Sequence, residues 1–166
     1  MPISTRSNGQ TIDETWFNIL KTEIEALQAS RDLIKENQSI EFEGLGYVDQ
    51  TTYYDNFMYY QVTRGITITA ARLYAFESGT SGSYDMDIKR KRGAGSWESI
   101  FTTRPGIPYT AGDNSNSDTG TGATAAVIDS TKEQLLAGDV LKLDILSVPV
   151  GAKDFILSLY YEPTGA

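Results

Sequence analysis

The sequence predicts a mainly β protein, an antiparallel jelly-roll-like β-sandwich preceded by one N-terminal amphipathic α-helix. The first observation is a change of hydrophobic period, from about 3.6 residues over 15–37 to two residues beyond position 38. The second is that turn signals such as RGAGS and LAGD separate short alternating segments, with no helical pattern between them. We therefore divide the chain into an N-terminal arm and helix, 1–37, and a β-sandwich domain, 38–166.

The predicted helix follows a polar arm over residues 1–10, and Thr11 and Glu14 have the spacing of a capping box at its start. Its apolar stripe recurs at alternating steps of three and four. The stripe consists of Phe17, Leu20, Ile24, Leu27 and Ile34. It packs either against copies in other chains or against its own sandwich. About two and a half heptads are marginal for a free coiled coil. We therefore favour association between chains in which the β-domains also contribute contacts.

Beyond residue 38, apolar and polar side chains alternate in five segments, as in half-buried strands. The inward residues are predicted to be Ile40 and Phe42; Ile66, Ile68 and Ala70; Tyr84, Met86 and Ile88; Leu141, Leu143 and Ile145; and Phe155, Leu157, Leu159 and Tyr161. The polar run 110–124 breaks this pattern and is predicted to be a long surface loop.

The amino-acid composition argues against several classes of function. The net charge of −8 disfavours binding to the phosphate backbone of nucleic acid. The chain has no Cys and no His, so thiolate chemistry and the commonest general base are excluded. We therefore expect a protein that is not an enzyme and binds no cofactor. The apolar runs are far too short for a membrane span, so we also expect no membrane partner.

Several polar clusters have both a functional and an ordinary interpretation. Asp113, Asn114, Asn116 and Asp118 carry oxygen ligands of the kind Ca²⁺ accepts, but the sixth and twelfth EF-hand positions hold Asp118 and Thr124, so we expect no metal site. The pairs Glu41 with Glu43 and Asp85 with Asp87 resemble glycosidase carboxylates, yet are typical of a solvent-facing strand. The run KRKR, Lys89 to Arg92, is predicted at a hairpin tip, where it binds a polyanion or is simply solvated.

Tyrosines gather in the segment TTYYDNFMYYQV, residues 51–62. Tyr53, Tyr54, Tyr59 and Tyr60 form either a platform for sugar rings or a strand whose two faces fill the core and an intersubunit contact.

Two resemblances follow from particular stretches. LLAGDVLKLDILSVPVGAKDFILSLYY, residues 135–161, resembles the last two strands of jelly-roll modules of the complement and tumour-necrosis-factor type. GQTIDETWFNILKTEIEALQ, followed by a compact acidic β-domain containing RPGIPYTAGD, is similar in layout to small virion proteins of tailed bacteriophages: decoration proteins, head fibres and tail-associated adhesins. The second resemblance implies a homotrimer in which a short helix or arm docks on the particle and a β-domain projects.

From these observations we expect a non-enzymatic structural protein located in a phage virion. Its expected partners are copies of itself and other virion proteins of the capsid or tail. The alternative is a carbohydrate- or receptor-binding module that attaches to a glycan on a host cell surface through the tyrosines.

Overall fold

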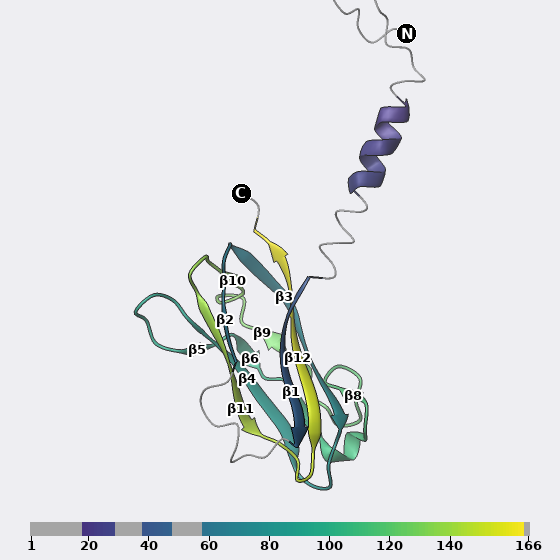
Figure 1. Cartoon of the computed structure of the whole chain (residues 1–166), viewed down its shortest axis with the longest axis vertical. Coiled ribbons are helices and arrows are strands. Elements are labelled where there is room, and N and C mark those ends of the chain that lie inside the picture. The colour runs from purple at the N-terminus through teal and green to yellow at the C-terminus, as the bar shows by residue number, and fades with distance from the viewer. Residues whose placement is uncertain (1–17, 29–37, 48–57, 165–166) are drawn as a thin grey trace, which may run out of the picture. The chain divides into compact units, whose positions relative to one another are not determined.

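The computed structural model describes residues 18–28, 38–47 and 58–164 (Figure 1). The chain has two units, Met1–Asn37 and Gln38–Ala166. In the first unit a helix covers residues 18–28, inside the segment predicted to be helical. The ends of that predicted segment, 15–17 and 29–37, lie outside the described residues.

The second unit is a β-sandwich of two five-stranded sheets and a short two-stranded ribbon, with antiparallel pairing throughout the described strands. Its strands are β1 (Ser39–Tyr47), β2 (Tyr59–Gln61), β3 (Ile66–Glu77), β4 (Ser83–Lys91), β5 (Glu98–Ser99), β6 (Phe101–Thr103), β7 (Gly106–Pro108), β8 (Ser115–Asn116), β9 (Val127–Ile128), β10 (Gln134–Leu135), β11 (Val140–Ser147) and β12 (Lys153–Pro163). A 3₁₀ helix, η1 (Tyr109–Ala111), follows β7. A mainly β fold of antiparallel sheets behind an N-terminal helix was predicted, and is confirmed.

Several strands that follow one another in the chain lie in opposite sheets. The first sheet has the order β1-β12-β3, with β10 and β8 both paired to β3; the second has the order β2-β11-β4, with β5 and β7 both paired to β4 (Figure 1). The ribbon joins β6 to β9. The chain therefore crosses between layers from β2 to β3, from β3 to β4 and again from β11 to β12. At the β3–β4 crossing Gly79 has a φ of +74° and a Cβ there would lie 2.5 Å from the Val150 carbonyl oxygen, so only glycine fits.

The core lies between the two sheets. The Tyr84 ring of β4 and the Phe155 ring of β12 meet across it with centroids 6.2 Å apart, and both side chains are fully buried. The Tyr84 hydroxyl donates to the carbonyl oxygen of Glu77 at 2.9 Å, so its polar atom is satisfied at the end of the sandwich. Burial, followed by nearby carboxylates, raises the pKa of Tyr84 well above its usual value, and the hydroxyl remains a neutral donor.

Most of the predicted alternation is confirmed. The inward side chains of β1, β4 and β12 are buried, and Leu143, Ile145 and Tyr161 pack against the core as partly buried residues. The fully buried members include Tyr84, Met86, Ile88, Leu141, Phe155, Leu157 and Leu159.

The prediction for Ala70 is wrong. Ile66 and Ile68 are buried, but Ala70 is exposed and the next buried residue of β3 is Ala71. The register between the two strands shifts at this point: Tyr160 of β12 pairs with Ala70 and Tyr161 pairs with Ile68, so Thr69 is an extra residue in β3. Such a β-bulge changes which residues of a strand face the core, and a strict period of two does not anticipate it.

The segment 110–124 is more ordered than a surface loop. Its β8 strand pairs with β3, with Asn116 opposite Tyr74. Ser117 is buried and its hydroxyl accepts a hydrogen bond from the Leu73 amide at 3.1 Å. Side-chain and backbone hydrogen bonds of small polar residues thus hold the segment against the edge of the first sheet, where apolar periodicity gives no signal.

Candidate functional site

The helical stripe is exposed where the structure describes it. Leu20, Ile24 and Leu27 are 44%, 53% and 70% exposed, and Ile19 beside them is 48% exposed. Phe17 and Ile34, the two ends of the predicted stripe, lie outside the described residues. At 3.6 residues per turn the three described stripe residues fall on one side of the helix, so they form one continuous apolar surface.

The tyrosine cluster divides between the described and the undescribed residues. Tyr53 and Tyr54 lie outside the part of the chain that the structure describes. Tyr59 and Tyr60 are neighbours in β2, so their side chains point to opposite faces of the sheet. Tyr60 packs against the core, whereas Tyr59 is 51% exposed on the outer face. The pair therefore offers one ring to solvent and one to the interior.

Tyr59 belongs to an aromatic and basic cluster that we call the Trp97 patch: Tyr59, Lys91, Trp97 and Lys142. The Tyr59 and Trp97 ring centroids are 5.9 Å apart, at 47° between planes. The Lys142 and Lys91 ammonium groups lie 5.3 and 5.8 Å from the Trp97 centroid, within cation–π distance. The patch thus combines two aromatic rings with two positive charges.

Strand register explains why these residues meet. Lys142 of β11 is directly opposite Tyr59 of β2 on one side and Lys89 of β4 on the other, so all three share the outer face of the second sheet. Asp144 accepts from Lys142 at 2.8 Å and also pairs with Lys89. Burial raises the pKa of Asp144, but hydrogen bonds and charge from these two lysines outweigh burial, and the pKa lies below its usual value.

Trp97 is not among the residues that the sequence patterns predict as a site. It stands in the turn segment RGAGSWES, and a large aromatic residue among Gly and Ser was the available signal. Its pairing with a tyrosine nearly forty residues earlier depends on strand order, which the sequence alone does not give.

The KRKR run does not form a concentrated basic tip. β4 extends through Lys91, so three of its residues are in the strand and only Arg92 precedes the turn at Gly93. Arg90 pairs with Glu98 at 3.3 Å, and Arg92 pairs with Asp139 at 2.7 Å. The charges are directed to opposite faces and largely compensated by carboxylates.

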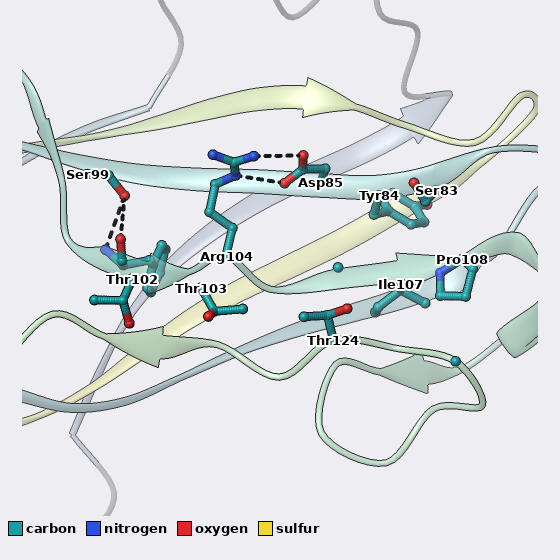
Figure 2. A pocket seen from close by; sticks show the side chains of 13 residues that line it. Ser83, Tyr84, Asp85, Ser99, Thr102, Thr103, Arg104, Ile107, Pro108 and Thr124 are labelled. Atoms are coloured by element: carbon teal, nitrogen blue, oxygen red, sulfur yellow. Dashed lines mark hydrogen bonds and ion pairs between the residues drawn. The ribbon is translucent and has the colours of Figure 1, made fainter.

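A polar recess lies beside the start of β4 (Figure 2). Its volume is about 650 Å³. Arg104 reaches Asp85 through two hydrogen bonds, Nε to Oδ1 at 3.0 Å and Nη2 to Oδ2 at 3.2 Å, and Figure 2 shows Thr103 and Thr124 on the opposite side of the recess. Hydrogen bonding to Asp85 raises the pKa of Arg104, so the guanidinium stays charged.

Three further carboxylates among the predicted candidates, Asp87, Asp113 and Asp118, each have a structural partner. Asp87 is buried and accepts from the Ser99 hydroxyl at 2.6 Å; burial raises its pKa above the usual value despite that bond. Asp113 accepts from the Ser78 amide at 2.8 Å, and Asp118 pairs with Arg72 at 2.6 Å.

Glu41 and Glu43 lie on β1, in the other sheet from Asp85 and Asp87, so the two predicted carboxylate pairs do not face one another. Among the residues that the structure describes, no group of three or more His, Cys, Asp and Glu is arranged to hold a metal ion.

Within the described ranges, no helix has the length and apolar character that crossing a membrane demands.

Comparison with models of protein families, with curated proteins and with solved structures found no match for this chain.

Proposed function

We propose that this chain is a non-enzymatic structural protein of a phage virion, a homotrimer whose β-domain projects from the particle. The observation that carries the proposal is the exposed apolar stripe of Leu20, Ile24 and Leu27. Burying one such side chain fully contributes roughly 1.5–3 kcal/mol. Burying several of them between associated helices therefore stabilises an assembly of chains. The described helix has eleven residues, 18–28, which is too short to hold chains together alone.

Strand order supports a finer assignment of the sandwich, and we infer that it is a jelly roll. The chain crosses between layers at β2–β3, β3–β4 and β11–β12, and β12 lies between β1 and β3. Two Greek keys wrapped into a double sheet produce this kind of order. The inference agrees with the resemblance of residues 135–161 to the last strands of jelly-roll modules.

The proposed partners follow from assigning attachment to the arm and helix and exposure to the β-domain. The polar arm, residues 1–10, and the helix dock on other virion proteins of the capsid or tail, while residues 38–166 face outward. The net charge of −8 suits an exposed, soluble surface.

Antibodies raised against residues 38–166 test the virion role. We expect them to label purified particles of the phage that encodes the chain, and to lose that label when the gene is deleted. Recovery of the protein in the free fraction of the lysate, with unlabelled particles, contradicts the role.

The Trp97 patch favours a second candidate, recognition of an acidic glycan on a host surface. Aromatic rings stack on sugar rings, and Lys91 and Lys142 beside Trp97 add attraction for a carboxylated or sulfated sugar. A glycan array with the full chain tests this candidate. We expect Trp97→Ala to abolish binding to acidic glycans, and Tyr109→Ala, which removes an exposed aromatic ring outside the patch, to leave it unchanged. An array without acidic glycan binding counts against recognition and leaves the virion role standing.

A further inference from the structure

The recess beside Arg104 has the size and walls of a small-ligand site. It is formed by the start of β4, by β6 and β7, and by the segment around Thr124 (Figure 2). Its volume of about 650 Å³ lies within the range of sites that hold small molecules. It shares no residue with the Trp97 patch, so its function is a separate question.

The Arg104–Asp85 pair gives the recess a matched donor and acceptor. The guanidinium has five N–H donors and uses two of them on Asp85; its other N–H groups make no hydrogen bond to the described residues. Both side chains are partly exposed, at 46% and 37%. Unused donors of Arg104 therefore lie beside unused lone pairs of Asp85.

The adjacent opposite charges of Arg104 and Asp85 favour an uncharged ligand. An anion approaching Arg104 also meets the Asp85 carboxylate, and a cation approaching Asp85 meets the guanidinium. A pair of neighbouring hydroxyl groups meets neither repulsion, because each hydroxyl both donates and accepts. A neutral polyol is thus favoured over phosphate, a carboxylate or a metal ion.

Threonines extend the polar lining. The hydroxyls of Thr103 and Thr124 make no hydrogen bond within the described part of the chain, and both residues line the recess (Figure 2). Pro108, which is partly exposed, lines it as well and gives the C–H face of a sugar ring a surface to pack on.

The positions of these groups are fixed by backbone pairing. Gly106 and Thr124 exchange two backbone hydrogen bonds, of 3.0 and 2.8 Å, and Thr103 is paired opposite Val127 in the ribbon. A Cβ at Gly106 would lie 3.3 Å from the Tyr84 carbonyl oxygen, so glycine allows β7 to lie close to β4. A preformed site loses less conformational freedom on binding.

We propose that this recess binds one ring of a neutral sugar through neighbouring hydroxyls held by Arg104 and Asp85, with Thr103 and Thr124 contacting the same ring. The proposal does not depend on the virion role or on the Trp97 patch. A single hexose has few atoms, so the expected dissociation constant is about 1 mM.

Titration of the ¹⁵N-labelled full chain tests the proposal. The probes are the methyl α-D-pyranosides of glucose, galactose and mannose, with methyl glucuronoside and inorganic phosphate as charged comparisons, each at up to ~20 mM. We expect at least one neutral glycoside to shift the amide signals of the non-proline residues in 102–107 and of residues 122–124. Thr124→Val and Arg104→Gln should each weaken that binding about tenfold, the loss expected for one or two hydrogen bonds. Thr69→Val, the same change on an exposed residue of the other sheet, should not alter it.

Three results would overturn the proposal. The first is the absence of shifts at residues 102–107 and 122–124 with every neutral glycoside. The second is binding by either Thr124→Val or Arg104→Gln that equals the parent chain. The third is tighter binding of phosphate or the glucuronoside than of any neutral sugar. Because Thr124→Val removes a hydroxyl without changing side-chain size, the test does not depend on how well the Arg104 variant folds.

Discussion

Arg92, directly after β4, binds Asp139, directly before β11, through two parallel hydrogen bonds: Nε to Oδ1 at 2.9 Å and Nη2 to Oδ2 at 2.7 Å. The Asp139 side chain is only 2% exposed and also accepts from the Leu136 amide at 2.9 Å. Two features that the sequence presents separately, the KRKR run and the Gly-Asp turn, therefore meet at one corner of the second sheet. Arg92 acts here as a structural cation.

We expect Asp139→Ala to lower the free energy of unfolding by about 2–3 kcal/mol, since it removes a bidentate pair and leaves the Leu136 amide without its acceptor. Urea denaturation measures the change. Asp118→Ala is the matched control, because Asp118 also pairs with an arginine, Arg72, but both side chains are more exposed. Its expected cost is about 0–1 kcal/mol. Equal losses for the two variants contradict the role assigned to Arg92 and Asp139.

Gly44 of β1 lies under the Phe155 ring, and a Cβ at position 44 would be 2.1 Å from the ring carbon Cε1. We expect Gly44→Ala to destabilise the sandwich by about 1–3 kcal/mol through overpacking. Combining it with Phe155→Leu, which vacates part of the ring volume, should cost clearly less than the two single changes added together. Additive free energies of unfolding in this double-mutant cycle contradict the contact.

Two carboxylates on the outer face of the second sheet should respond to pH with opposite signs. Burial raises the pKa of Asp87, so the folded state holds its proton more tightly than the unfolded chain, and stability rises as the pH falls through that raised value. The pKa of Asp144 is lowered on balance by its lysine partners, so its contribution is present above the usual value of 3.8 and lost below it.

At pH 7 we therefore expect Asp87→Asn to raise the melting temperature and Asp144→Asn to lower it. Both differences from the parent chain should shrink in acid, once the carboxyl of the parent is protonated. Thermal unfolding by circular dichroism at pH 7 and near pH 3 measures them. Differences that keep their size at both pH values contradict the assigned shifts.

The sequence is informative where one strand face is buried and uninterrupted. Tyr84, Met86 and Ile88 alternate strictly and are all fully buried, as predicted. Ala70 differs because a bulge in β3, where Thr69 is the extra residue opposite Tyr160 and Tyr161 of β12, moves the inward phase by one residue. The segment 110–124 was predicted as a loop because its order comes from hydrogen bonds of small polar residues, which leave no apolar pattern.

The candidate sites were harder to predict, for one physical reason. The Trp97 patch and the Arg104 recess depend on which strands become neighbours, and antiparallel pairing joins residues far apart in the chain. Tyr59 was identified from its aromatic neighbours in sequence, but Trp97 becomes its partner only through the order β2-β11-β4-β5. Arg104 and Asp85 likewise meet because β7 pairs with the start of β4.

Sedimentation and light scattering of the purified full chain test the central proposal, self-association through the helical stripe, most directly. We expect a particle of three times the chain mass of 18.3 kDa. We also expect Leu20→Lys combined with Ile24→Lys to give the single-chain mass, and Thr22→Lys, on the polar side of the same helix, to keep the trimer. A mass of 18.3 kDa for the parent chain across concentrations contradicts it.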